Sequence, residues 1–287
     1  MKLSPTLRPS VLTLAASVAL ATSSPAAFVP FDTFDSYTPG PLNGRGPAGN
    51  VWTAQTGATL IDGGLGDLRA RMDGAASIPN FRTLGPAGLS ILNASTAATV
   101  YWNFTISSAV TGNNWNFVIT DDAAPVDTAG TSEVQFNYDA TQAGAFRARN
   151  AGAFKFLSLD GTVAGRVNPI AGVLYNAWFE INNFANTYQV FLQSDSDPAL
   201  ATRKLMFADD GTGNLFGFRN GAATNDLITA NMGSGTAGSI VTFDDIYVDT
   251  AGLNAANPSS VPEPASATLL ALAALTTSLR RRRPCAE

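Results

Sequence analysis

The sequence predicts an all-β protein whose central part forms an antiparallel two-sheet sandwich, with one apolar helical segment near each end of the chain. Three observations predict this organisation. Apolar and polar residues alternate along several central segments, and clusters of Gly, Asn, Asp and Pro separate these segments. Uncharged apolar stretches beside basic residues lie near both ends, where they are typical of export and membrane-targeting signals.

Residues 1–27 have the plan of a secretory signal peptide. Lys2 and Arg8 precede an uncharged stretch whose apolar centre spans residues 11–21, and small residues follow, including Ala26 and Ala27. A basic start, a short apolar centre and small residues at the cut are the parts of such a peptide. We therefore predict cleavage after Ala26 or Ala27, with an uncleaved N-terminal anchor as the alternative.

The β-sandwich domain is expected over residues 28–250, and its charge is acidic. Removal of both terminal segments leaves 11 Lys and Arg against 20 Asp and Glu, a net charge of −9. An acidic surface disfavours nucleic acid and anionic lipid as partners. The single cysteine, Cys285, lies in the C-terminal tail, so the domain has to be stable without a disulfide.

Alternation is clearest at residues 99–107, where Val100, Trp102 and Phe104 fall on one face of the segment. Because successive side chains of a strand point to opposite sides, this pattern predicts a half-buried strand. Further strands are expected at residues 68–72, 115–120, 133–138, 145–150, 154–159, 215–219 and 240–248. Many strands joined by polar turns favour two antiparallel sheets packed face to face.

A predicted hairpin joins residues 175–182 to residues 187–193 through a polar turn. With Trp178 and its Asn-rich turn, it resembles the central hairpin of the concanavalin A-like and laminin-G-like sandwiches. Residues 31–37 resemble the first strand of these domains, and residues 242–248 resemble their closing strand. The resemblance implies a jelly roll from residue 28 to about residue 249, with its first and last strands paired.

The C-terminal tail consists of three successive parts. Residues 251–260 are polar and are expected to be a linker. Pro262, Glu263 and Pro264 follow, and the two prolines favour extended backbone. Residues 265–279 then carry no charge and predict an apolar helix, which is shorter than the roughly 20 residues of a full membrane span.

Four basic residues end the apolar helix: Arg280, Arg281, Arg282 and Arg283. Clustered arginines stop transfer and keep this end in the cytoplasm. The tail therefore predicts a short transmembrane anchor; a core helix with a solvated basic end is the alternative.

The tripeptide, the apolar helix and the arginine cluster in this order resemble the PEP-CTERM sorting signal of Gram-negative bacteria, over residues 261–287. One departure from the family's pattern is the extension of four residues after the arginines. The resemblance implies export across the inner membrane, transient anchoring there, and processing by an exosortase and the secretion machinery. It also implies a final place at the cell surface or in the extracellular matrix, beside exopolysaccharide and biofilm systems.

Residues able to carry catalysis are scarce. The chain has no histidine, which excludes Ser-His-Asp and Cys-His nucleophile systems and removes the commonest zinc ligand. Glycoside hydrolysis needs two carboxylates about 5–9 Å apart. Glu133 and Glu180 are the glutamates of the expected domain, and we expect both on solvated strand faces. No catalytic residue, metal or cofactor is predicted, with calcium at an Asp-rich turn (residues 121–122, 195–197 or 209–211) as an alternative.

Two pairs of arginines are candidate ligand-binding residues. Arg69 with Arg71, and Arg147 with Arg149, are two positions apart, so each pair projects from one face of its strand. Planar guanidinium groups suit the carboxylates of acidic sugars. Pairing with Asp or Glu on neighbouring strands is the alternative.

The sequence thus predicts an exported, non-catalytic, carbohydrate-binding sandwich whose possible partner is extracellular polysaccharide. Two other functions stay open: a glycosidase or lyase acting on polysaccharide, and a structural matrix protein. Exposed Trp or Tyr would favour sugar binding, but Trp102 and Trp115 alternate with the apolar residues and are expected in the core. Trp52 and Trp178 are left open.

Overall fold

The computed structural model describes residues 27–64, 67–73, 80–84, 89–106, 114–124, 132–140, 142, 144–219, 225–234 and 240–260. Most of the predicted signal peptide, residues 1–26, and the predicted sorting signal, residues 261–287, lie outside these residues. Within the described part of the chain, no helix combines the length and apolar character needed to cross a lipid bilayer.

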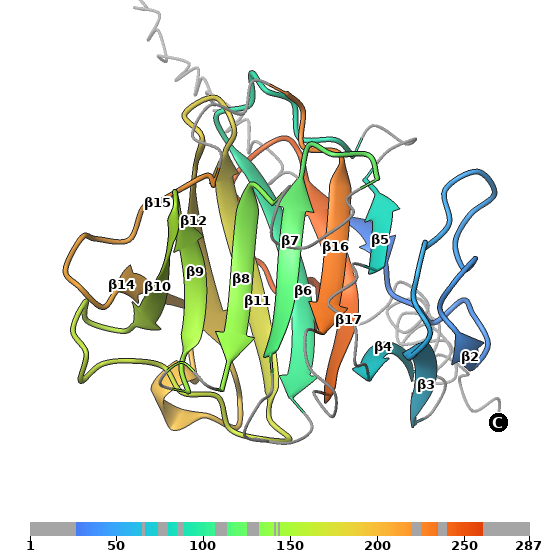
Figure 1. Cartoon of the computed structure of the whole chain (residues 1–287), viewed down its shortest axis with the longest axis horizontal. Coiled ribbons are helices and arrows are strands. Elements are labelled where there is room, and N and C mark those ends of the chain that lie inside the picture. Colours follow the sequence, from blue (N-terminus) through green and yellow to red (C-terminus); the bar gives the residue numbers. More distant parts are fainter. Residues whose placement is uncertain are drawn as a thin grey trace, which may run out of the picture.

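Two antiparallel β-sheets pack face to face (Figure 1), which confirms the predicted all-β, two-sheet sandwich. The ten-stranded sheet has the order β13-β12-β11-β6-β17-β4-β3-β2, with β1 also paired to β17 and β15 to β12. Its strands are β1 (Val29–Asp32), β2 (Gly40–Pro41), β3 (Ala58–Gly64), β4 (Asp67–Asp73), β6 (Ala98–Ile106), β11 (Leu174–Asn182), β12 (Thr187–Gln193), β13 (Lys204–Leu205), β15 (Phe216–Gly217) and β17 (Ile240–Asp249).

The seven-stranded sheet has the order β14-β10-β9-β8-β7-β16-β5 and lies in front in Figure 1. Its strands are β5 (Asn80–Thr83), β7 (Asn114–Thr120), β8 (Val134–Asp139), β9 (Phe146–Asn150), β10 (Ala153–Ser158), β14 (Phe207–Ala208) and β16 (Thr229–Ser234). Helical structure in the described residues consists of two single-turn 3-10 segments, Pro198–Leu200 and Pro258–Ser260.

Aromatic side chains fill the space between the sheets. Trp102 of β6 stacks on Phe117 of β7 with ring centroids 4.1 Å apart, and Phe104 of β6 lies 4.9 Å from the ring of Trp115. These residues are fully buried, as the alternation predicts for Trp102 and Trp115. Each large ring removes about 150–250 Å² of surface from water, so this cluster supplies much of the folding free energy.

The two ends of the domain meet, because β1 pairs with β17 and Val29 lies opposite Val248. The expected pairing of first and last strands is thereby confirmed. The first strand is shorter than the 31–37 motif suggests. It ends at Asp32, since Phe34 has a φ of 61° and the Tyr37 amide donates to the Phe34 carbonyl in a turn.

Residues 251–260, expected to be a free linker, instead lie against the outer face of the ten-stranded sheet. We call this segment the C-terminal strap. The Thr99 hydroxyl donates to the Gly252 carbonyl at 3.0 Å and accepts from the Asn254 amide at 2.9 Å. The Trp178 indole donates to the Ala256 carbonyl at 2.9 Å. Composition did not predict this docking, because a polar segment can dock by backbone hydrogen bonds that composition does not reveal.

Candidate ligand-binding face

The outer face of the seven-stranded sheet carries a row of amides that leads to arginines. Across neighbouring strands, Asn116 lies opposite Asn137, and Asn137 lies opposite Arg147. These positions alternate with Phe117, Phe136 and other core residues, so they point away from the core.

Hydrogen bonds fix this row. The Asn137 amide nitrogen donates to Asn116 Oδ1 at 2.7 Å, and its Oδ1 accepts two hydrogen bonds from the Arg147 guanidinium. Gln135 Nε2 also donates to Asn116 Oδ1, at 2.7 Å. Arg147 also forms an ion pair with Asp139, whose carboxylate lies 3.2 Å from Arg147 Nη2. Since these side chains are buried, the row holds Arg147 in one position.

Two phenylalanine rings of β10 flank the arginines. Arg149 lies opposite Phe154, and Arg147 lies opposite Phe156. The guanidinium carbons of Arg147 and Arg149 lie 4.6 Å and 4.8 Å from the centre of the Phe154 ring. Arg166 lies over Phe156 at 4.1 Å. Such contacts keep the planar cations flat on the surface.

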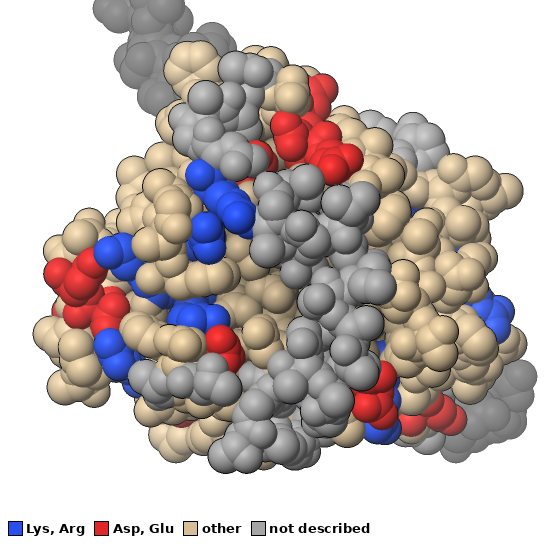
Figure 2. Space-filling view, in the orientation of Figure 1, with Lys and Arg blue, Asp and Glu red and all other residues tan. Residues whose placement is uncertain are grey.

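We call this region the arginine–phenylalanine face; it comprises Arg147, Arg149, Phe154, Phe156 and Arg166. Figure 2 shows Lys and Arg gathered over the β9 and β10 side of the sheet, with a few Asp or Glu beside them. Arg166 pairs with Asp209 and Lys155 with Asp210, both at 2.5 Å. The rings of Phe154 and Phe156 are half-exposed, so the face offers both cations and apolar surface.

Electrostatics differ between the two predicted arginines. Burial lowers the pKa of Arg147, and Asp139 opposes that shift. Burial and then the neighbouring Arg219 lower the pKa of Arg149. Both groups stay protonated at neutral pH. Arg147 is thus a buried, paired structural cation, whereas Arg149 is half-exposed beside a second cation.

The other predicted pair lies on the opposite side of the molecule. Arg69 and Arg71 belong to β4 of the ten-stranded sheet. Arg69 Nη2 lies 2.6 Å from Asp67, and Arg71 Nη2 lies 2.8 Å from Asp73. Both of these partners lie two residues away on the same strand. Arg69 Nε also lies 3.5 Å from Asp244 of the neighbouring strand β17, which is the cross-strand pairing that the alternative expected. The four arginines therefore do not form one groove.

A hollow of about 320 Å³ lies beside Arg69 and contains an acidic group. Burial and the neighbouring carboxylates of Asp245 and Asp67 raise the pKa of Asp244 to about 9. Burial and the carboxylates of Asp35 and Asp67 raise the pKa of Asp245 to about 6. Among the residues described, no three His, Cys, Asp or Glu side chains are placed to hold a metal ion.

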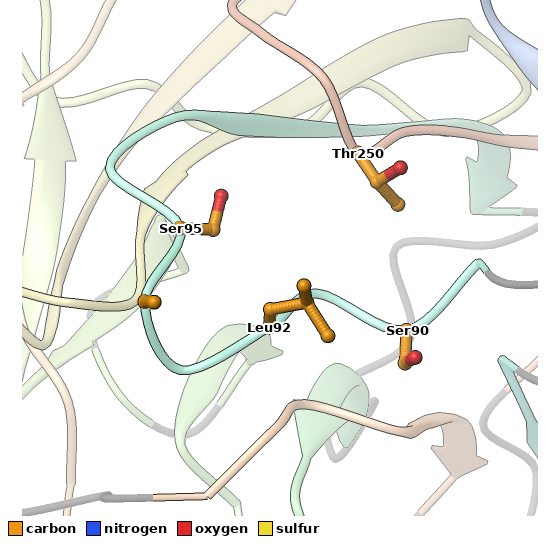
Figure 3. Close-up of a pocket in the computed structure, with 5 residues that line it drawn as sticks. Ser90, Leu92, Ser95 and Thr250 are labelled. Carbon is orange, nitrogen blue, oxygen red and sulfur yellow. The ribbon is translucent and has the colours of Figure 1, made fainter.

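A second hollow, of about 470 Å³, is lined by Ser90, Leu92, Ala94, Ser95 and Thr250. Figure 3 shows Thr250 on one side and Ser90, Leu92 and Ser95 of a single loop on the other. The Ser95 hydroxyl already donates to the Ala97 carbonyl at 3.0 Å. These lining residues carry hydroxyl groups and apolar side chains. They therefore offer a ligand no charge and few hydrogen bonds.

The two glutamates are not on solvated faces, so that expectation was wrong. Glu133 is 1 % exposed beside the seven-stranded sheet. Glu180 lies on β11 of the ten-stranded sheet and pairs with Arg203 at 2.5 Å. Glu133 directly precedes β8 of the seven-stranded sheet, whereas Glu180 is part of the ten-stranded sheet.

Carboxylates of the Asp-rich turns form hydrogen bonds and ion pairs within the fold. Asp122 and Asp197 accept backbone amides, Asp121 accepts from Asn225, and Asp209 and Asp210 form the ion pairs given above. Trp52 and Trp178 are both fully buried. Trp178 lies opposite Tyr101 on the outer face of its sheet, but the C-terminal strap and Arg203 contact it.

Sequence reasoning missed the amides of the row and Arg219. Asn116, Gln135 and Asn137 occupy the polar positions of two predicted strands. A pattern of amides instead of Thr or Lys at such positions was the available signal. Arg219 follows the short strand β15, and only the fold places it beside Arg149.

Comparisons with known proteins leave the family open: no family model matches, and no curated protein matches. Similar solved structures include xylan β-1,4-xylosidase from Bacillus halodurans, at 10 % identity and a TM-score of 0.37 over 63 % of this chain and 32 % of that one. This chain therefore spans about a third of that enzyme.

The legume lectin-like domain from Entamoeba histolytica has 4 % identity and a TM-score of 0.42 over 68 % of this chain and 87 % of that one. Lectin II from Ulex europaeus has 10 % identity and a TM-score of 0.39 over 75 % and 96 %. These scores are low, so function has to be argued from the chain's own residues.

Proposed function

We propose that this protein is an exported, non-catalytic β-sandwich that binds polysaccharide on its arginine–phenylalanine face. The observation that supports this proposal is the combination of fixed guanidinium groups with half-exposed phenylalanine rings on one sheet face. Guanidinium groups donate to sugar oxygens in a planar arrangement, and aromatic rings pack against the apolar faces of sugar rings.

Preorganisation supports the proposal as well. Arg149 is held by the Ala151 and Gly152 carbonyls, so little side-chain freedom is lost at this position when a ligand binds. A shallow face with few contacts gives weak binding. We expect dissociation constants of about 10⁻³ to 10⁻⁵ M, which correspond to about 4–7 kcal/mol.

Binding without catalysis agrees with the side chains that are present. The chain has no histidine, and Glu133 directly precedes a strand of the seven-stranded sheet, whereas Glu180 is part of the ten-stranded sheet. An inverting or retaining glycosidase needs two carboxylates facing one glycosidic bond. We infer that the described face holds a glycan without cleaving it.

The test is titration of the full-length chain with neutral and acidic polysaccharides, combined with an assay for new reducing ends. Binding without new reducing ends is the expected result. Accumulating reducing ends would assign the protein to the polysaccharide-degrading enzymes. Absence of binding to every polysaccharide would favour the structural matrix protein.

Export and sorting complete the proposal and depend on the two terminal segments of the sequence. Expression in a Gram-negative host with and without an exosortase, followed by mass spectrometry, tests both. With the exosortase, the surface or medium protein should lack residues 1–25 and 280–287. A full-length chain retained in the inner membrane of that host would contradict the proposed processing.

A further inference from the structure

We propose that Arg149 and Arg219 form an anion-binding subsite that selects polysaccharides bearing carboxylates. This inference rests on the proposed function and names its substrate class. Arg149 is the second-last residue of β9. The Arg219 amide donates at 3.2 Å to the carbonyl of Glu133, the residue before β8, which places Arg219 beside the start of β8 and near the end of β9. The pair therefore lies at one end of the arginine–phenylalanine face.

Arg149 and Arg219 differ from most other basic residues in lacking a described counter-charge. Seven basic side chains of the described residues form ion pairs with carboxylates: Arg69, Arg71, Arg82, Arg147, Lys155, Arg166 and Arg203. Arg149 and Arg219 form none with any described residue. Their mutual repulsion contributes to the lowered pKa of Arg149. In a domain with an excess of acidic residues, two adjacent half-buried cations without a carboxylate partner in the described part of the chain are unusual.

Arg219 also has an unused donor. Its Nη1 is buried and has no hydrogen-bond acceptor among the described residues, although a buried guanidinium nitrogen normally has one. Arg149 uses Nε and Nη2 on the Ala151 and Gly152 carbonyls, at 3.1 Å and 3.0 Å. These bonds fix the Arg149 guanidinium without neutralising it. An arriving anion would be attracted by the positive charges of both residues.

The surface beside the two arginines is apolar. Phe154 lies under the Arg149 guanidinium, so an anion bound there has an apolar ring within reach. A uronic acid residue presents a carboxylate beside a sugar ring with an apolar face. Guanidinium groups bind carboxylates through two parallel hydrogen bonds. Arg147 cannot bind a sugar carboxylate in this way, because its guanidinium is already bonded to Asp139 and Asn137.

The experiment compares polygalacturonate, dextran sulfate and neutral dextran in titrations of the full-length chain. We expect at least about tenfold tighter binding of polygalacturonate than of dextran, falling as salt rises. Arg149→Gln/Arg219→Gln should remove that advantage. Arg149→Lys/Arg219→Lys keeps the charge but loses the planar fork, so it should retain only part of it.

A matched control removes two positive charges elsewhere. Arg45 and Lys204 lie in or beside the ten-stranded sheet, and the described residues include no carboxylate partner for either. Arg45→Gln/Lys204→Gln should leave polygalacturonate binding unchanged. An equal loss in this variant would assign the effect to net charge and overturn the subsite.

The outcomes separate this inference from the proposed function. Equal affinity for dextran and polygalacturonate, unchanged by the arginine variants, would overturn the subsite and leave polysaccharide binding standing. No binding to any polymer would overturn the proposed function itself. Equal binding of dextran sulfate and polygalacturonate would contradict carboxylate selectivity. A melting temperature lowered by more than about 5 °C in Arg149→Gln/Arg219→Gln would assign the pair a structural role instead.

Discussion

At the scale of single residues, one buried carboxylate connects the two sheets. Asp32 of β1 accepts from the Phe34 amide, the Tyr37 hydroxyl, the Trp52 indole and the Arg82 guanidinium, at 2.5–2.9 Å. β1 belongs to the ten-stranded sheet and Arg82 to β5 of the seven-stranded sheet. Because every partner is a donor, the charge of Asp32 is compensated although the residue is buried.

Removal of this carboxylate should be costly. We expect Asp32→Ala to lower the free energy of unfolding by about 3–5 kcal/mol, since it leaves the buried Arg82 without its counter-charge. Asp73→Ala, which breaks the more exposed ion pair with Arg71, should cost less than about 1 kcal/mol. Urea denaturation measures both values. Equal losses in the two variants would contradict the role of burial.

A second substitution of a single residue tests the aromatic core. Phe104 is fully buried and packs against Trp115 and Tyr175. Phe104→Ala should therefore cost about 3–5 kcal/mol in the free energy of unfolding. Phe184, whose side chain is 71 % exposed in the hairpin turn, provides the matched control. A loss below about 1 kcal/mol for Phe104→Ala would mean that its face is not the core.

At the scale of elements, alternation predicted the long strands and failed for the short or glycine-containing ones. β6, β11 and β12 follow the expected segments to within one residue. β16 has the sequence Thr-Ala-Asn-Met-Gly-Ser, in which polar and small residues hide the pattern. It is a strand because β7 and β5 pair with it on both sides, and tertiary pairing overrides such weak local preference.

The candidate site was also predictable only in part from the sequence. The two-residue spacing of Arg147 and Arg149 predicted that both project from one strand face, and both contact Phe154 there. Their different environments were not predictable, because Asp139 and Arg219 reach them from other segments. Spacing gives the face of a strand, whereas long-range pairing decides which charges meet on it.

The docking of the C-terminal strap can be tested by changing Thr99. Thr99→Val removes the hydroxyl that bonds both Gly252 and Asn254 while keeping the shape of the side chain. Faster hydrogen exchange is expected in residues 252–256, with exchange in β11 unchanged, since local contacts govern local opening. Thr105→Val on the same strand is the control. Unchanged exchange in the strap would show that its docking does not depend on Thr99.

At the scale of the whole molecule, the two outer faces differ in charge. Arg149 of the seven-stranded sheet and the neighbouring Arg219 have no described carboxylate partner. On the ten-stranded sheet, three carboxylates and one arginine surround one hollow: Asp67, Asp244, Asp245 and Arg69. Two opposite fields on one domain orient a charged polymer toward a single face. The acidic hollow has a separate consequence for stability, because its carboxyl groups bind protons more tightly in the folded state.

Stability should therefore fall as pH rises from about 4 to 9. The pKa values of Asp244 and Asp245 are raised to about 9 and about 6, above the ordinary 3.8. Over this range the folded state holds protons that the unfolded state has released, so the free energy of unfolding decreases with pH. The decrease is steepest below pH 6, where both groups contribute, and each adds at most about 1.4 kcal/mol per pH unit.

Asp244→Asn tests the assignment, because the amide keeps the size of the side chain and removes its titration. Denaturation at pH 5, 6, 7 and 8 should give a shallower decline for this variant, with higher stability than the wild type at pH 8. Asp62→Asn, at an exposed position of β3, should follow the wild type. Parallel curves for wild type and Asp244→Asn would place the pH dependence elsewhere in the protein.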